Sequence, residues 1–520
     1  MYRLHILKRD YSEYEFIKEE EKVELSVDPI KEKLFHEDTF DIINDKIDRT
    51  GSILRNTKKI QGVLVLKNNK TYGSFSKKLL YKCIPNNSSY PCFLIPYFPK
   101  LNFQKSFSNL FINFEFKEWV GQHPIGTIVD LIGSVDDNNS LYEYELYCKG
   151  LNTSLNLFTK TILPLIPLTE TKENTSPFIF SIDPINSKDF DDAFSIQENK
   201  ISIYISNVPF FIEKMKSSAW DIFTEQDRIS TIYLPNSKKS LLPTILSDDL
   251  CSLKENCWRD TLVMEIENNN IHFSIQNVYI SKNFVYEENE LLENKNYQKL
   301  FQKSKELLSN YPYVNSIQDS HELVSYFMIM MNHQIGLRLS SGIYRMTEQI
   351  EKEEIEKEQI EKENMKMLLY DSVGLYTNQK EMAYHKMLNL QSYIHITSPI
   401  RRLVDIVNMI LFQQEMKLFV YSRPAIQFVD KWLNQINIIN EKNKIIKRVQ
   451  NKCNMIHNLS NLTEVEGIGI DNQEIFIPSI KCFYSISSLE NLELYKTYTF
   501  KIILFEDENK LKKRIKLICI

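Results

Sequence analysis

Several features that would place a protein in a class at once are missing from this chain of 520 residues. No apolar run is long enough to cross a membrane, and the first residues, Met1-Tyr-Arg-Leu-His-Ile, lack the pattern of a secretory signal. The sequence therefore predicts neither membrane contact nor secretion.

Paired cysteines are also absent. The eight cysteines are scattered along the chain, and none of them belongs to a C-x-x-C pair. This spacing indicates neither a zinc site nor a disulfide framework. Because scattered thiols are typical of a reducing compartment, we expect an intracellular protein of the cytoplasm or the nucleus.

An excess of positive charge, the usual sign of a nucleic-acid-binding protein, is missing as well. The chain has 63 basic and 68 acidic residues, a net charge of −5. Residues 348–364 hold eight glutamates and three lysines, which is also −5, so the remainder is formally neutral. Basic charge in that remainder could still be concentrated along one path.

The acidic segment repeats every five residues. Five residues turn a helix by about 500°, so Ile350, Ile355 and Ile360 do not share a face. The segment is therefore not a coiled coil. We expect either a solvated helix or a disordered insertion on the surface.

A cluster of four aspartates is the most informative feature that is present. Asp183, Asp189, Asp191 and Asp192 lie within ten residues, between two segments of alternating apolar residues. This pattern predicts a strand, an acidic loop and a second strand. Clustered carboxylates repel one another unless a cation cancels their charge, and Mg²⁺ prefers such oxygens. Several carboxylates also suit two ions about 3.5–4 Å apart, as in phosphodiester hydrolysis. The competing interpretation is a solvated acidic turn.

A second motif, Tyr393-Ile-His-Ile-Thr-Ser-Pro-Ile-Arg-Arg402, lies far downstream. Ser398 followed by Pro399 predicts the start of a helix with an apolar face. Arg401 and Arg402 would then lie in its first turn, where the helix dipole disfavours cations. Two arginines beside free backbone N–H groups predict a phosphate site. The alternative is that they pair with Asp405 or other acids.

Together with a third block, these motifs resemble the RNase II (RNB-domain) family of processive 3′→5′ exoribonucleases. The acidic stretch matches the family pattern I-D-P-x-x-x-x-D-x-D-D-A. The later stretch matches Y-x-H-F-T-S-P-I-R-R, with Ile396 in place of phenylalanine. Residues 233–253 match Y-L-P…L-P-x-x-L-S-x-x-L-C-S-L. The layout is most similar to the RNase II-type subunit of the eukaryotic exosome, without its N-terminal endonuclease domain.

The resemblance implies an α+β chain with four parts. Residues 1–55 would be a degenerate first cold-shock-like region, for which an irregular lead-in is the alternative. Residues 56–160 would be a second cold-shock domain of the OB type. Residues 161–455 would be the RNB catalytic domain, with a mixed sheet and helices. Residues 456–520 would be an S1-like OB barrel. Its basic end would contact phosphate, and the alternative is that this end is simply a soluble strand.

Short strands broken by Gly, Asn and Pro in the second part independently indicate a small barrel. OB barrels bind single strands by stacking bases on aromatic rings. The candidate rings are Tyr72, Phe75, Tyr81 and Trp119. For each of them a place in the core is the favoured interpretation.

The resemblance also implies the chemistry. Asp183, Asp189, Asp191 and Asp192 would hold one or two Mg²⁺ ions, with Mn²⁺ as a substitute. Asp191, Asp192 and Arg401 would be catalytic. The residues expected to contact RNA are Tyr233, Asn332, Ser398, Arg401 and Arg402. Single-stranded RNA would be degraded from its 3′ end to nucleoside 5′-monophosphates, by a protein that we expect to be a monomer.

Besides Ile396, the chain departs from the family pattern at three places. Of the two aromatics that clamp the terminal bases in relatives of the bacterial enzyme, only Tyr233 can be placed. An expected glutamate in a late helix is Gln450, and Leu403-Val404 replaces a common Tyr-Pro. These changes would affect product length or processivity rather than the metal ligands.

Two other functions compete with this one. The first is a catalytically silent RNA-binding scaffold with the RNB fold, and the second is a metal-dependent nuclease that acts on DNA. The four aspartates and Arg401 argue against the scaffold, because a self-repelling acidic cluster brings it no advantage.

Overall fold

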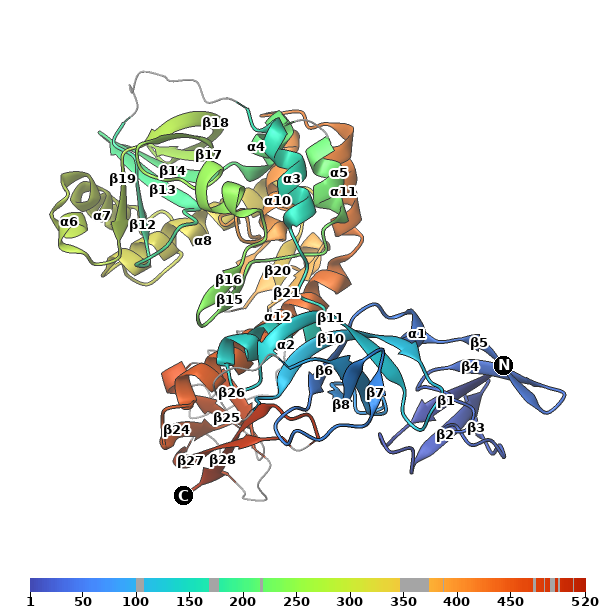
Figure 1. Ribbon diagram of the computed structural model, residues 1–520. Helices are drawn as coiled ribbons and strands as arrows, with labels where there is room; N and C mark the ends of the chain where they lie inside the picture. Colours follow the sequence, from blue (N-terminus) through green and yellow to red (C-terminus); the bar gives the residue numbers. More distant parts are fainter. Residues whose placement is uncertain are drawn as a thin grey trace. The chain divides into compact units, whose positions relative to one another are not determined.

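A computed structural model describes residues 1–99, 107–167, 177–215, 218–346, 374–386, 388–470, 474–480, 482–486, 492–493, 496–507 and 509–520 (Figure 1). The predicted surface insertion at 348–364 lies outside these residues. The chain forms two compact units. One comprises Met1–Asn152, Leu234–Asn236 and Asn451–Ile520, and the other Thr153–Tyr233 and Ser237–Gln450.

The first unit begins with a five-stranded antiparallel sheet in the order β3-β2-β1-β4-β5. Its strands are β1 (Tyr2–Ile6), β2 (Tyr14–Lys18), β3 (Glu21–Val23), β4 (Thr39–Ile43) and β5 (Lys46–Gly51), and the short α1 (Ile53–Asn56) follows. The first 55 residues are therefore a regular sheet and not an irregular lead-in.

A second sheet in the same unit closes on itself. Its order is β6-β10-β11-β9-β8-β7, and an additional pairing joins β6 to β8. The strands are β6 (Ile60–Leu64), β7 (Ser74–Phe75), β8 (Lys78–Pro85), β9 (Phe93–Tyr97), β10 (Leu110–Glu118) and β11 (Ile125–Ser134), followed by α2 (Asn138–Cys148). This is the small barrel predicted from the broken strand pattern.

The candidate stacking aromatics of the barrel divide into two pairs. Tyr81 and Trp119 are buried in the apolar cluster that the barrel shares with the N-terminal sheet, as the core interpretation predicts. Tyr72 and Phe75 are partly exposed, and the ammonium groups of Lys70 and Lys117 lie over their rings.

The C-terminal part of the first unit is a five-stranded sheet in the order β26-β25-β24-β27-β28. Its strands are β24 (Glu464–Gly469), β25 (Glu474–Ile477), β26 (Cys482–Ser485), β27 (Thr497–Glu506) and β28 (Lys513–Cys519). Part of its basic end is already paired within the protein. Lys512 is buried against Glu145, and Arg514 forms an ion pair with Asp507.

The second unit is built on a six-stranded sheet in the order β18-β17-β14-β13-β12-β19. The strands are β12 (Phe180–Asp183), β13 (Asp192–Gln197), β14 (Lys200–Ser206), β17 (Cys257–Glu267), β18 (Asn270–Ile280) and β19 (Lys282–Val285). The pairing of β12 with β19 is parallel, and the other pairings are antiparallel. The sheet is therefore mixed, as predicted.

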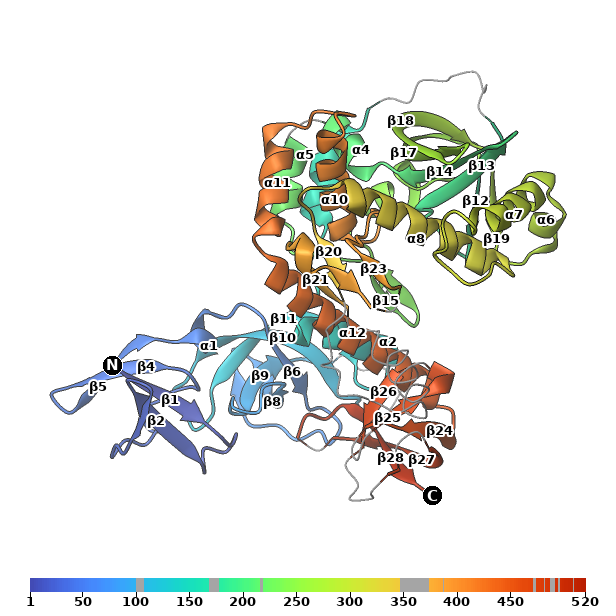
Figure 2. The same ribbon diagram turned by 180° about the vertical axis from the view of Figure 1, so that it is seen from behind.

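Alternate residues of these strands face different apolar clusters. Phe194, Ile203 and Leu262 join a large cluster with α7 (Lys295–Leu307), α8 (Ser320–Arg338) and α10 (Leu403–Glu415). Ala193, Tyr204 and Val263 belong to a smaller cluster of their own. Both views show α8 extending from beside α10 to beside α7 (Figures 1 and 2).

Among the described residues, the other α-helices of this unit are α3 (Asn156–Ile162), α4 (Val208–Met215), α5 (Ser218–Glu225), α6 (Asn289–Glu293) and α11 (Arg423–Leu433). Helix α10 packs against α4 and α11, and α11 packs against α5. Helix α12 (Ile436–Leu459) runs from this unit into the first. The short strands are β15 (Ile232–Leu234), β16 (Ser237–Lys239), β20 (Tyr344–Met346), β21 (Leu375–Thr377), β22 (Tyr384–His385) and β23 (Leu390–Gln391). The predicted α+β class is confirmed.

Among the residues that the structure describes, no helix combines the length and apolar character needed to cross a membrane.

Candidate active site

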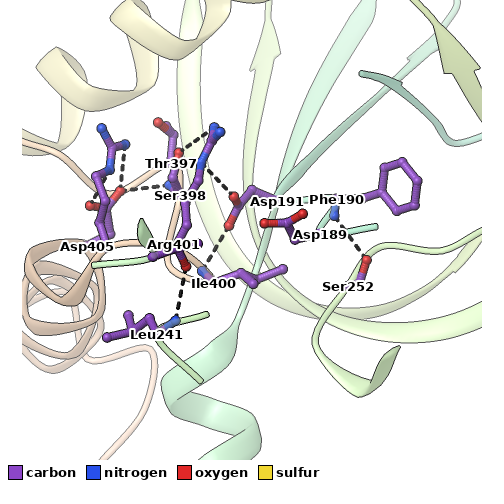
Figure 3. Close-up of polar contacts among 12 residues, drawn as sticks. Asp189, Phe190, Asp191, Leu241, Ser252, Thr397, Ser398, Ile400, Arg401 and Asp405 are labelled. Atoms are coloured by element: carbon purple, nitrogen blue, oxygen red, sulfur yellow. Dashed lines mark hydrogen bonds and ion pairs between the residues drawn. The ribbon is translucent and has the colours of Figure 1, made fainter. Parts of the chain in front are cut away.

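The acidic loop joins two neighbouring strands of the large sheet, as the sequence predicts. Asp183 is the last residue of β12, and Asp192 is the first residue of β13. The loop is held by backbone contacts to the segment before β17. Phe190 donates its N–H to Ser252 Oγ at 3.0 Å (Figure 3). The carbonyl of Phe190 accepts the N–H of Leu253 at 2.9 Å.

The carboxylates are not splayed into solvent. Asp191 is 2% exposed and Asp192 is 7% exposed. The Oδ2 atom of Asp183 is buried and accepts no hydrogen bond from the residues described. The interpretation as a solvated acidic turn is therefore wrong, because a solvated turn would leave these oxygens to water.

Burial dominates the proton affinities of these groups, since removal from water disfavours a charged carboxylate. It raises the pKa of Asp191 to about 7 and that of Asp192 to about 8. It also raises the pKa of Asp183, to about 7, and the neighbouring Asp191 acts in the same direction. Arg401 opposes each of these shifts.

Arg401 and the acidic loop meet in space although they are far apart in the chain. The Arg401 Nε lies 3.0 Å from Oδ2 of Asp191. Oδ1 of the same carboxylate accepts the backbone N–H of Ile400 at 2.9 Å (Figure 3). Asp191 is thus bonded to two consecutive residues of the downstream motif. The Arg401 side chain remains 46% exposed.

The helix that follows begins later than predicted. Ser398 is not its N-cap, because residues 399–401 form a turn and α10 starts at Leu403. Arg402 is extended and forms an isolated bridge with Ser230, and Leu403 donates its N–H to Ile229. This pairing holds the chain out of the helical conformation. The arginines therefore precede the first turn, and the predicted conflict with the helix dipole does not arise.

The two arginines have different partners. The guanidinium of Arg402 contacts both oxygens of the buried Asp405 at 2.9 Å. Asp405 also accepts the backbone N–H of Ser398 at 2.7 Å. Ser398 is itself buried, and its hydroxyl accepts a hydrogen bond from Arg401 at 3.0 Å. The predicted alternative of pairing with Asp405 thus holds for Arg402, whereas Arg401 pairs with the acidic loop.

Asn332 lies in α8, 3% exposed, and both ends of its amide are bonded within the protein. Its Oδ1 accepts the N–H of Ile396, and its Nδ2 donates to the hydroxyl of Tyr393. These bonds position the strand-like segment that leads to the arginines. A direct contact of Asn332 with RNA stays a prediction.

Tyr233 lies at the edge of the acidic cluster. The residue is 42% exposed, and its hydroxyl donates to Oδ2 of Asp189 at 3.1 Å. Its backbone carbonyl accepts a hydrogen bond from Gln450 at 3.2 Å. The substituted position Gln450 therefore supports the tyrosine predicted to stack on a base.

The sequence reasoning missed two residues of this site. Lys238, on β16, places its ammonium 3.0 Å from Oδ1 of Asp189. Tyr286 donates its backbone N–H to the carbonyl of Asp183, and its ring stacks on His321 with centroids 3.8 Å apart. Lys238 could have been noticed as a charge inside the third family block, whereas no sequence pattern pointed to Tyr286.

The donor set fits a hard divalent cation. Asp192 is buried and Asp183 is partly buried at adjoining strand ends, and the buried Oδ2 of Asp183 has no hydrogen-bond partner in the described part of the chain. Carboxylates that are removed from water and lack a counter-charge are the ligands that Mg²⁺ and Mn²⁺ accept.

A comparison with known families matches residues 171–322 and 288–417 to the RNB domain. These ranges contain the acidic loop, the third block and the arginine motif. Residues 171–417 of the chain therefore match an RNB domain.

Individual relatives and solved structures agree with this assignment. Exoribonuclease 2 of Psychromonas ingrahamii is 31% identical over 151 residues, which are 28% of this chain and 23% of that protein. The structure of Mycoplasma genitalium RNase R in complex with ribose-methylated single-stranded RNA matches over 100% of both chains, with a TM-score of 0.68 and 15% identity. Yeast Ssd1, described as a pseudonuclease, matches with a TM-score of 0.53 and 14% identity, over 85% of this chain and 66% of Ssd1. The sequence match thus spans less than a quarter of the curated relative.

Proposed function

We propose that this protein is a divalent-cation-dependent 3′→5′ exoribonuclease that hydrolyses single-stranded RNA to nucleoside 5′-monophosphates. The observation that carries the proposal is the meeting of Asp191 with Ile400 and Arg401. It brings the guanidinium of the partly exposed Arg401 beside buried carboxylates. A phosphate could then be bound between the arginine and a cation held by the carboxylates, as cleavage of a phosphodiester requires.

In this proposal Asp183, Asp189, Asp191 and Asp192 hold one or two Mg²⁺ ions, or Mn²⁺ in their place. A cation held by these residues would supply polarisation of the phosphate and a more nucleophilic water near neutral pH. The buried aspartates keep the cation at the strand ends and exclude competing water. Their raised pKa values mean that protons and cations compete for the same oxygens near neutral pH.

The other residues would position the RNA. Asp191 would orient the guanidinium of the partly exposed Arg401, and this guanidinium would contact the phosphate. The ring of Tyr233 would stack on a base near the 3′ end, since it is partly exposed and fixed at its hydroxyl. Arg402 and Ser398 would act through the buried Asp405 by holding the turn that presents Arg401.

The names of the relatives support this proposal. The matched bacterial protein is named an exoribonuclease, and the matched Mycoplasma genitalium RNase R was solved with single-stranded RNA. We also propose that the protein acts as a monomer.

A silent RNA-binding scaffold is the second candidate, and the likeness to the pseudonuclease Ssd1 is what favours it. The buried aspartates argue against it. A scaffold gains nothing from carboxylates whose charge must be neutralised, because buried charges without partners destabilise the fold.

The test is a product ladder from one defined RNA, labelled at either end, with Mg²⁺ and with EDTA. With the 5′ label, fragments should shorten progressively from the 3′ end; with the 3′ label, a nucleoside 5′-monophosphate should appear first. EDTA should stop both. Internal cuts would contradict exonuclease action, and RNA that is bound but never shortened would support the scaffold. A DNA strand of matched sequence should be degraded far more slowly, and equal rates would instead indicate a nuclease without RNA preference.

A further inference from the structure

Lys238 lies inside the acidic cluster and bridges two carboxylates. Its ammonium is 3.0 Å from Oδ1 of Asp189 and 2.9 Å from Oδ1 of Asp248. The lysine side chain is 23% exposed, and that of Asp189 is 13% exposed. Solvent and salt weaken the attraction between charges that are this well shielded from water much less than they weaken an ion pair on the surface.

The remaining oxygen of Asp189 also has a partner. Its Oδ2 accepts the hydroxyl of Tyr233 at 3.1 Å. Both oxygens of Asp189 are therefore bonded to protein donors, whereas Oδ2 of Asp183 is buried without one. The four aspartates are thus not equivalent as ligands.

The charges divide in the same way. Asp191 is paired with Arg401, and Asp189 is paired with Lys238. Lys238 is shared with Asp248, and among the four aspartates only Asp183 and Asp192 have no cationic side chain at ion-pair distance within the described residues. One divalent cation balances these two carboxylates. A second cation near Asp189 would have to displace the ammonium or lie beside its like charge.

From this arrangement, and resting on the proposed function, we propose that Lys238 stands in for a second divalent cation. The centre of this chain then takes one divalent cation, held by Asp183 and Asp192 with Asp191 beside them. Lys238 is a positioning residue that neutralises Asp189, and its removal opens a second cation site there.

The test counts Mn²⁺ ions bound to the full chain at a fixed pH, from the electron paramagnetic resonance signal of free Mn²⁺. It needs no catalytic turnover. Asp192→Asn should abolish Mn²⁺ binding at this centre and leave binding elsewhere on the protein unchanged. The difference between wild type and this variant is therefore the number of ions bound at the centre. The wild-type protein should lose one Mn²⁺ on this substitution. Lys238→Gln should bind one Mn²⁺ more than wild type, and the added Asp189→Asn substitution should remove that gain.

Two further variants serve as controls. Lys238→Arg keeps the charge and should bind the wild-type number of ions. Lys200→Gln removes a half-buried lysine that pairs with Glu265 at 2.9 Å. Lys200 lies at the opposite end of β14 from Ile205, which pairs with Asp192. Lys200→Gln should therefore also leave the number of bound Mn²⁺ ions unchanged.

Two Mn²⁺ ions at the wild-type centre, or an unchanged count in a folded Lys238→Gln protein, would overturn the inference. If Lys238→Gln fails to fold, the wild-type count alone decides, because only a single ion agrees with the proposal. Two ions would leave the exoribonuclease proposal intact. No ion dependent on Asp192 would overturn both.

Discussion

At the scale of single residues, the site depends on how Asp191 is bonded. One oxygen accepts the N–H of Ile400 and the other lies beside the guanidinium of Arg401. A neutral side chain of the same shape can keep the first contact, but it cannot balance the arginine. The charge of Asp191 and its volume can therefore be tested separately.

We expect Asp191→Asn to lower the turnover of single-stranded RNA by about a hundredfold or more, since it removes a charge from a preorganised site. Binding of the same RNA should remain, because Arg401 is released from its carboxylate partner. Turnover of labelled RNA and fluorescence anisotropy measure the two effects. Asp227→Asn, at an exposed ion pair with Lys442, should change neither. Wild-type turnover in Asp191→Asn, or loss of RNA binding, would contradict the assigned roles.

Asp192 provides a prediction about pH. Because burial raises its pKa to about 8 from an ordinary value of 3.8, the folded protein holds a proton that the unfolded chain has released. Its favourable contribution to stability is therefore present below about pH 4 and is lost as the pH rises through about 8. Without divalent cations, Asp192→Asn should melt above wild type at about pH 8.5, by a margin that shrinks toward about pH 5.

At high pH, Mg²⁺ should make the wild-type protein melt above Asp192→Asn. It should raise the melting temperature of the wild-type protein at about pH 8.5 and leave that of Asp192→Asn nearly unchanged, because the variant lacks a ligand. Thermal melts followed by circular dichroism, with EDTA or with Mg²⁺, make the comparison. If the difference in melting temperature between Asp192→Asn and wild type grew as the pH fell, burial would not be holding the Asp192 carboxyl in its neutral form.

At the scale of elements, α8 and the segment before α10 approach each other closely at Gly336. A Cβ built on this residue would collide with the backbone carbonyl oxygen of Ser392. The contact matters for the site because Asn332, one turn earlier in α8, holds Ile396 and Tyr393 of the same segment. The helix thus sets the position of the chain that carries Arg401.

We expect Gly336→Ala to lower the free energy of unfolding by about 1–3 kcal/mol, the usual cost of forcing a group into a filled space. The sign is informative, because alanine in a helix otherwise stabilises by about 1 kcal/mol relative to glycine. Ser325→Ala, at an exposed position of the same helix, is the control and should have little effect. Urea unfolding measures both variants, and a stabilised Gly336→Ala protein would show that the two segments are not in contact.

At the scale of the whole molecule, distant parts of the chain within the first unit are joined by one buried carboxylate. Oε1 of Glu145, in α2, lies 2.7 Å from Lys452 near the end of α12 and 2.7 Å from Lys512 beside β28. Burial acts to raise the pKa of Glu145, but the two lysines outweigh it and hold this pKa below its ordinary value. The carboxylate therefore stays ionised and links the N-terminal and C-terminal parts of the unit.

Glu145→Gln should leave two lysines near each other without their counter-charge. We expect a loss of about 3–5 kcal/mol in the free energy of unfolding, as for other buried pairs from which one partner is removed. Limited proteolysis should then release a fragment beginning after α12 sooner than in wild type. Lys496→Gln breaks an exposed pair with Glu493 and should not alter the fragment pattern. Unchanged cleavage in Glu145→Gln would mean that the C-terminal sheet is held by other contacts.

Local sequence patterns determined most of the elements and the identity of the site. Period-two alternation predicted the strands on either side of the acidic loop, and short broken strands predicted the small barrel. Spacing and residue type also singled out the four aspartates and Arg401, and the family resemblance added Tyr233. These features could be predicted because each depends on neighbours a few residues away.

Only the tertiary structure decided what each charged group is paired with. It bonded Arg401 to Asp191 and Arg402 to Asp405, moved the start of α10 to Leu403, and brought Lys238 to Asp189. The physical reason is that backbone pairing at Ile229 and Ser230, and the burial of each carboxylate, come from segments remote in the chain. A local pattern can indicate that a charge must be neutralised, but the group that neutralises it is chosen by packing.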